Sequence, residues 1–137
     1  MCMTILQTAS AVIELGAGLA LLCCPLAAAT LLIGAPLDGA AAFTVARVCG
    51  AGLLSLGVAC WLARGDTQSR AARGLIAAML IYDVAVAALL AFAALGWGLH
   101  GVALWPAVVL HGVMSVWCVA CLRRGTVSVP MEGHLLN

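Results

Sequence analysis

Residues 75–95 read LIAAMLIYDVAVAALLAFAAL, an apolar run with a single charged side chain, that of Asp83. A membrane-spanning α-helix needs about 20 consecutive apolar residues, because it rises about 1.5 Å per residue through a hydrocarbon layer about 30 Å thick. Strands in globular proteins are usually much shorter than this run. The stretch therefore predicts a transmembrane helix, and it decides the fold class because the rest of the chain repeats its pattern.

The composition of the whole chain agrees with this interpretation. The chain has 137 residues, of which 66% are hydrophobic and 8% are charged, whereas a soluble domain carries roughly 25% charged residues. The formal net charge of +1 produces no long-range field that would attract a polyanion, and no basic patch is interleaved with aromatic residues. We therefore expect a lipid bilayer as the main environment and no nucleic-acid partner.

Three other apolar runs have a comparable length and are separated by short polar or glycine-rich breaks. They cover residues 10–33, 41–63 and 102–122, and each is long enough to cross a bilayer. The sequence thus predicts an all-α integral membrane four-helix transmembrane bundle formed by residues 1–124. Residues 125–137 are expected to form a short cytoplasmic tail.

The arginines predict how the bundle is oriented. Arg64, Arg70 and Arg73 lie between the second and third runs, and Arg123 and Arg124 follow the fourth, while the other two loops contain no cation. Cytoplasmic loops carry an excess of Lys and Arg, so the rule places this side and both termini in the cytoplasm. The abundance of Ala and Gly together with the absence of Lys suggests a bacterial source and hence the bacterial cytoplasmic (inner) membrane.

Four ionisable side chains fall inside the predicted spans: Glu14, Arg47, Asp83 and His111. Each costs roughly 2.5–3.5 kcal/mol at the centre of a bilayer, so such groups usually face the bundle interior and find partners. One hypothesis is a buried polar cluster in which Asp83 pairs with His111, Arg47 compensates the remaining charge, and Glu14 accepts protons. The alternative is that these groups only join the helices by hydrogen bonds. Tyr82 points about 100° away from Asp83 on a helix and is expected to be an ordinary packed aromatic residue.

The seven cysteines lie mostly within apolar runs, where a thiol behaves as a small hydrophobic group. We therefore expect no disulfide framework and no cofactor. Cys118 and Cys121 form a C-x-x-C sequence at the end of the fourth run, and Cys60 ends the second run on the same side. Three thiols at one depth are weak candidates for a soft-metal site, but packing thiols without a metal are the favoured interpretation.

Small residues and one proline predict how the spans pack. Gly16, Gly18 and the segment 50–57, with its repeated Gly, Ala and Ser residues, allow close approach of helix backbones in a bilayer. Tight packing of the first span on the second is expected. Pro25 is expected to kink the first span, because proline removes a backbone hydrogen bond inside a helix.

Three segments carry a family resemblance: LIGAPLDG at 32–39, ARVCGAG at 46–52 continuing to ACW at 59–61, and LWPA at 104–107 continuing to His111. They resemble small uncharacterised four-helix bacterial membrane proteins, loosely DoxX-like. The resemblance covers most of the chain and implies a four-helix membrane fold without assigning a catalytic residue.

A second resemblance rests on Glu14 within VIELG at 12–16. The chain is similar in this feature to small multidrug resistance antiporters, four-helix dimers with a proton-coupled Glu in the first helix. The resemblance implies that Glu14 binds protons. The Tyr82 and Asp83 pair and His111 depart from the pattern of that family.

The sequence contains no G-x-S-x-G, phosphate-binding glycine loop or H-E-x-x-H motif, so we expect no enzyme. The leading expectation is a non-enzymatic accessory or assembly subunit that packs against other membrane subunits or against itself. The alternative is a small proton-coupled transporter that uses Glu14, Asp83 and His111.

Overall fold

The computed structural model describes residues 1–66 and 69–124, and the predicted tail at 125–137 lies outside the described residues. The described chain is helical, with α1 (Cys2–Cys23), α2 (Pro25–Ile33), α3 (Gly39–Ala63), α4 (Arg70–Gly96) and α5 (Leu104–Arg124). All of these except the short α2 are long and apolar enough to cross a membrane. The predicted all-α membrane bundle with four spanning helices is confirmed.

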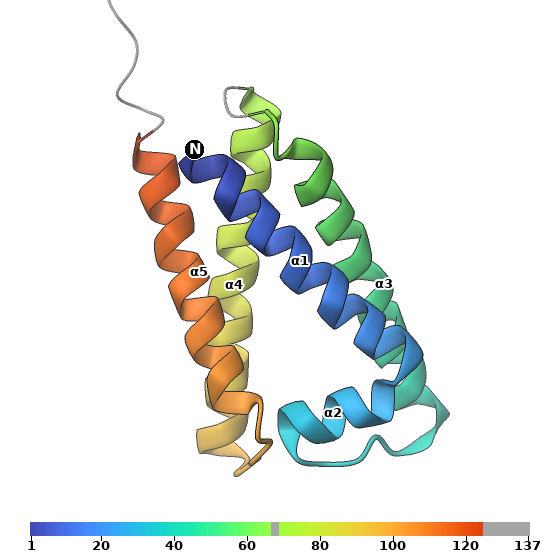
Figure 1. The fold of residues 1–137 in the computed structure, drawn as a ribbon. Helices are drawn as coiled ribbons and strands as arrows, with labels where there is room; N and C mark the ends of the chain where they lie inside the picture. The colour runs from blue at the N-terminus through green and yellow to red at the C-terminus, as the bar shows by residue number, and fades with distance from the viewer. Residues whose placement is uncertain (67–68, 125–137) are drawn as a thin grey trace, which may run out of the picture.

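The first span differs from its predicted bounds of 10–33. Helix α1 already begins at Cys2 and ends at Cys23, and α2 starts as a separate helix at Pro25. Proline is favourable in the first turn of a helix and disruptive inside one, and Cys24 between the two helices leaves the helical region with φ −133° and ψ 56°. Pro25 therefore ends the first span and begins α2, which lies across the far end of the bundle (Figure 1).

The four long helices form two pairs. Helix α1 packs mainly on α3, and α4 mainly on α5, while contacts between the pairs are few. The pairs meet near the N-terminus and diverge toward α2, which lies between their far ends (Figure 1). The backbone N–H of Ala103 donates to the Leu31 carbonyl at 2.9 Å, so α2 is held against the loop that joins α4 to α5.

Glycines set the close approach of α1 to α3. A Cβ built on Gly18 would lie 2.8 Å from the Gly50 carbonyl oxygen, and one on Gly50 would lie 2.9 Å from the Gly18 carbonyl oxygen. A Cβ on Gly57 would meet the Leu15 backbone nitrogen at 3.0 Å. The predicted tight packing between the first two spans is confirmed, although Gly16 faces open space.

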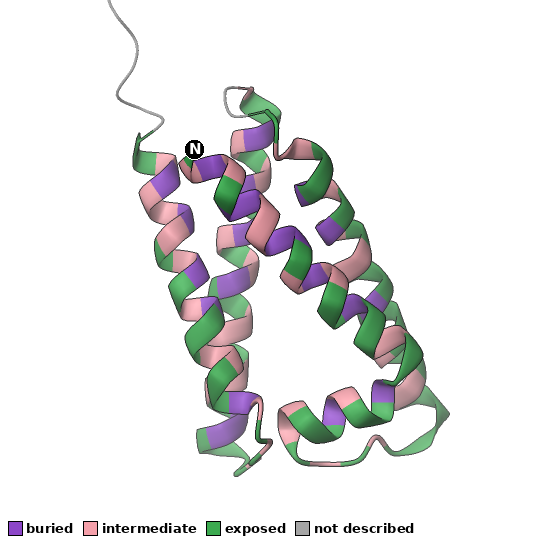
Figure 2. Ribbon diagram, in the orientation of Figure 1, coloured by how far each residue is buried: buried purple, intermediate pink, exposed green. Residues whose placement is uncertain are grey.

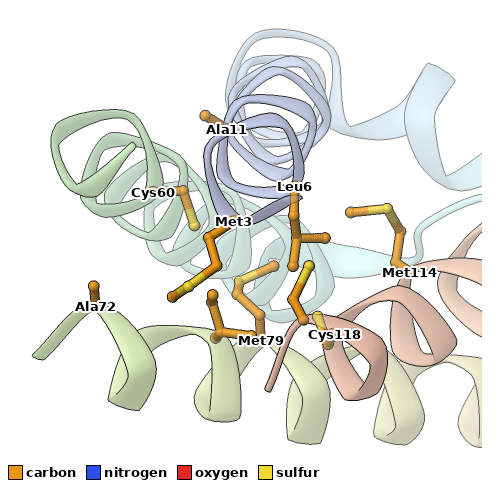
Figure 3. Packing of buried hydrophobic residues seen from close by; sticks show 10 residues of the cluster. Met3, Leu6, Ala11, Cys60, Ala72, Met79, Met114 and Cys118 are labelled. Carbon is orange, nitrogen blue, oxygen red and sulfur yellow. The ribbon is translucent and has the colours of Figure 1, made fainter. Parts of the chain in front are cut away.

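The buried apolar core occupies the end where the pairs meet. Figure 3 shows Met3 and Leu6 of α1 pointing toward Met79 of α4 and Cys118 of α5. Purple segments, which mark buried residues, are frequent along α1 near the N-terminus and on the facing parts of α4 and α5 (Figure 2). The outer faces are largely exposed and apolar, as expected of helices that face lipid.

A disulfide joins Cys2 to Cys121 across a sequence separation of 119 residues. The expectation of no disulfide framework is corrected by this bond. The bond forms because the start of α1 and the end of α5 reach the same end of the bundle, with a Cα–Cα distance of 6.0 Å. It links the α1/α3 pair covalently to the α4/α5 pair.

Candidate functional site

Asp83 of α4 and His111 of α5 form a hydrogen bond inside the bundle. The distance between His111 Nδ1 and Asp83 Oδ1 is 2.8 Å, and the residues are 1% and 9% exposed. Asp83 lies near the middle of the 27-residue α4, which is long and apolar enough to cross a membrane, so the pair lies far from both ends of this span. The α4/α5 hairpin therefore holds an acid and an imidazole in direct contact at depth.

Glu14 approaches this pair from α1 and is 2% exposed. Its carboxyl group lies within electrostatic range of Tyr82, Asp83 and His111. The site is therefore shared between the two helix pairs, with Glu14 on one and the Asp83–His111 pair on the other.

Tyr82 is packed against the buried core, as expected of an aromatic residue, and it also contacts the candidate site. Its ring stands edge-to-face against the His111 ring with 5.7 Å between centroids. Neighbouring residues on a helix point about 100° apart, which is compatible with both facing inward when α1 and α5 lie on adjacent sides of α4. Tyr82 therefore contacts the imidazole of the Asp83–His111 pair.

Arg47 is exposed, so the hypothesis that it compensates charge within the cluster is wrong. Helix α3 packs mainly on α1 and barely touches α4, and Gly50 and Gly57 form its face toward α1. Arg47 is therefore left on the outer surface of the pair. The charge of the site then depends on how many protons its two carboxyl groups and its imidazole carry.

Gln7 and Ser10 belong to the same buried face of α1, and the sequence analysis missed them. Each is 2% exposed. Together with Glu14 they follow a spacing of three and four residues, which places them on one side of a helix. That spacing is visible in the sequence. The predicted start of the first span at Ser10 leaves Gln7 outside the span and Ser10 at its boundary.

Several polar atoms of this face, and one of Asp83 on α4, have no hydrogen-bond partner among the described residues. They are Gln7 Oε1 and Nε2, Ser10 Oγ, Glu14 Oε2 and Asp83 Oδ2. A buried polar group without a partner costs about 1–3 kcal/mol. The four side chains that carry these atoms would together cost about 4–12 kcal/mol, which is comparable with the net stability of a typical protein.

Cys60, Cys118 and Cys121 do not form the three-thiol metal site for which they were weak candidates. Cys121 is bonded to Cys2, while Cys60 and Cys118 are buried free thiols. Within residues 1–66 and 69–124, no group of three or more His, Cys, Asp or Glu side chains is placed to hold a metal ion.

No protein-family model, curated protein or solved structure matches this chain. The DoxX-like resemblance and the likeness to small multidrug resistance antiporters therefore stay predictions.

Proposed function

We propose that this protein is a small proton-linked membrane transporter whose proton-binding groups are Glu14, Asp83 and His111. The observation that carries the proposal is the buried Asp83–His111 hydrogen bond, with a second acid facing it from the other helix pair. Ionisable groups inside a membrane are costly and are typical of proton relays and substrate pathways. A histidine changes its charge near neutral pH more readily than any other unperturbed side chain.

Protonation of this site changes the force between the two helix pairs. When His111 is protonated and Asp83 is ionised, they form an ion pair within the α4/α5 hairpin. When His111 loses that proton, the negative charge on Asp83 is uncompensated and repels an ionised Glu14 on α1. The repulsion is strong because the surrounding dielectric constant is low.

The arrangement of the pairs allows such a force to produce movement. Contacts between the pairs are few compared with those within them, and the pairs already diverge toward α2 (Figure 1). Loading and release of a proton at the site would thus favour different separations of the pairs. Differential stabilisation of two arrangements is what couples binding to a conformational change.

The experiment is a pH jump on proteoliposomes adsorbed to a solid-supported membrane electrode, which records charge displaced when protons bind. We expect displaced charge in the unaltered protein and its loss in Asp83→Asn. Asp38→Asn is the matched control, because Asp38 is exposed at the start of α3. Equal charge displacement in the empty membrane and in all three proteins would refute the proposal.

We also propose the orientation predicted from the arginines, with both termini in the cytoplasm of a bacterial inner membrane. Arg64 and Arg70 flank the loop between α3 and α4, and Arg123 and Arg124 end α5. Fusions of a fluorescent protein and of a periplasmic phosphatase to the C-terminus test it. Fluorescence without phosphatase activity is expected, and the opposite result would reverse the orientation.

A second candidate function is that of an accessory subunit in a larger membrane assembly or a homo-oligomer. It is supported by an apolar depression on the outer face of α5 around Gly112, lined by Val109, Val113, Val116, Trp117 and Ala120. Small residues at helix surfaces favour helix association in bilayers. The intact mass after mild-detergent extraction tests this candidate, since a single-chain mass would exclude a stable assembly.

A further inference from the structure

Arg47 carries a positive charge inside a membrane span and on its outer surface. It is the ninth residue of the 25-residue α3, about 12 Å from the start of the helix and about 6 Å from its middle at 1.5 Å per residue. Its side chain is exposed, and within the described part of the chain it makes no hydrogen bond or ion pair. Charged residues within spans almost always face a bundle interior and are paired, because a charge exposed to hydrocarbon is costly. The surface around Arg47 is therefore open to another molecule and gains from one that supplies an anion.

The acidic residues of the described chain cannot supply that anion from a second copy. Two of them are buried inside the bundle and two lie beyond the ends of α3: Glu14, Asp83, Asp38 and Asp66. A second copy in the same orientation would therefore present no exposed carboxylate of the described residues at the depth of Arg47, and packing α3 on α3 would bring two arginines together. Glu132 lies outside the described residues, and Glu132→Gln is for this reason one of the variants measured.

The residues around Arg47 on this side of α3 are small. Positions three to four and seven to eight residues away lie on the same side of a helix. The exposed residues at these positions are Gly39, Ala40, Thr44, Ala51 and Ser55. The hydroxyls of Thr44 and Ser55 donate to carbonyl groups of α3 itself, so the guanidinium group is the one that needs a partner.

The outer side of α4 has a different character. Its exposed residues include Ile81, Leu89 and Phe92, large apolar side chains that are suited to contact with lipid tails. Small residues at a helix surface instead allow the backbone of another helix to approach closely. The surface of α3 around Arg47 therefore fits a neighbouring helix better than lipid tails.

A neighbouring helix also supplies an anion at the required depth. The hydrocarbon layer extends about 15 Å to either side of its midplane, so with α3 centred in the layer the headgroups lie about 9 Å further out than the Cα atom of Arg47. The arginine side chain would have to extend along the helix over most of that distance to reach a lipid phosphate. A carboxylate on an adjacent helix can lie beside the guanidinium and accept two parallel hydrogen bonds from it.

We propose that the surface of α3 around Arg47 binds a transmembrane helix of another protein that carries a carboxylate at the same depth. Arg47 forms an ion pair with this carboxylate, and the small residues allow the two backbones to approach. The inference rests on the second candidate function, an accessory subunit in a larger membrane assembly, and names the chemistry of its partner. It is independent of proton-linked transport, because Arg47 lies outside the proton-binding site.

The test measures energy transfer between the labelled full-length protein and a labelled transmembrane peptide in phosphatidylcholine vesicles. The peptide is a helix of Leu and Ala with one Asp about 6 Å from its middle, and a matched peptide carries Asn in that place. We expect the Asp peptide to associate more tightly than the Asn peptide. Arg47→Leu should weaken association with the Asp peptide by about 5- to 30-fold, while Arg47→Lys should retain most of it because the charge remains.

Arg64→Leu is the matched control, because Arg64 follows the end of α3 and its guanidinium already lies over the Trp61 ring. Arg47→Leu is expected to fold, since Arg47 makes no hydrogen bond or ion pair in the described chain, and its unfolding midpoint in denaturing detergent checks this. Equal association of the Asp and Asn peptides, or no loss in folded Arg47→Leu, would overturn the proposal in favour of a lipid phosphate. Stronger association in Glu132→Gln would overturn it by showing that Arg47 already has a partner within the chain.

The proposal and the second candidate function can fail separately. A single-chain mass after mild-detergent extraction, together with Arg47-dependent peptide association, would exclude a stable assembly and keep the binding surface. A larger mass that is unchanged in Arg47→Leu, together with equal association of the two peptides, would keep the assembly and refute the binding surface.

Discussion

Replacing Gly50 with alanine should lower the stability of the protein against unfolding far more than replacing Gly52 with alanine. A Cβ on Gly50 would lie 2.9 Å from the Gly18 carbonyl oxygen and 3.0 Å from the Leu22 backbone nitrogen. Both are backbone atoms, so a change of side-chain rotamer cannot relieve these two close contacts. Helix α1 must move away from α3 by roughly half an ångström to restore an ordinary contact, and overpacking of this kind costs about 1–3 kcal/mol.

Gly52→Ala provides the matched control, because a Cβ at Gly52 would have nothing within 4 Å. Both substitutions gain the same helix propensity, about 1 kcal/mol for Gly to Ala in water, so this contribution cancels when the two are compared. We expect Gly50→Ala to be less stable than Gly52→Ala by about 1–3 kcal/mol.

The assay is reversible unfolding in mixed micelles of increasing denaturing-detergent content, followed by tryptophan fluorescence. The midpoint should fall for Gly50→Ala and stay unchanged or rise for Gly52→Ala. Equal midpoints for the two variants would refute the conclusion that backbone contact at Gly50 holds α1 against α3.

Three further predictions follow from other contacts. The protein unfolded without reductant should react with five maleimide molecules, because five cysteines are free while Cys2 and Cys121 are bonded to each other. After reduction, Cys2 and Cys121 should also react. Labelling of Cys2 and Cys121 before reduction would show that the bond is absent. Gly101→Ala should lower the unfolding midpoint while Gly65→Ala should not, because a Cβ on Gly101 would overlap an α2 carbonyl and one on Gly65 has open space. Ser69→Ala should destabilise the protein by about 1 kcal/mol, because the Ser69 hydroxyl accepts a hydrogen bond from a backbone N–H in the first turn of α4. The measurement is the shift of the unfolding midpoint in denaturing detergent. An unchanged midpoint would show that the cap contributes nothing.

The disulfide brings two physical expectations into conflict. Positive charges indicate that the end holding Cys2 and Cys121 is cytoplasmic, whereas disulfides are rare in the reducing cytoplasm. Trapping thiols in living cells before lysis resolves the conflict. Both cysteines should be reduced there and pair on oxidation, whereas a bond already present in cells would favour the opposite orientation.

Hydropathy alone determined the number and approximate limits of the membrane spans. An apolar run of sufficient length must satisfy its backbone hydrogen bonds internally in lipid, so it must be helical wherever it crosses. The first span showed the limit of this reasoning. Helix α1 begins at Cys2, whereas hydropathy predicts a start at Ser10 because the polar Gln7 interrupts the apolar run. A polar residue can also lie inside a span when its side chain faces the bundle interior, as Gln7 does.

The composition of the candidate site was only partly readable from the sequence. The depths of Asp83 and His111 follow from counting residues along two antiparallel helices, and this suggested that they could meet. Arg47 was also assigned to the cluster because it falls inside a span, yet it is exposed. The depth of a residue in its span therefore indicates which side chains could meet inside the bundle, but it does not determine the direction in which each side chain points.

The sequence by itself thus determined an all-α membrane protein with four spanning helices, and the close packing of its first two spans. Only the tertiary structure decided that the helices form two diverging pairs, that Tyr82 contacts His111, and that the start of α1 and the end of α5 meet at Cys2 and Cys121. The physical reason is that lipid and protein interior are both apolar. A transmembrane helix therefore carries little amphipathic signal for its rotation, which is set by packing against its neighbours.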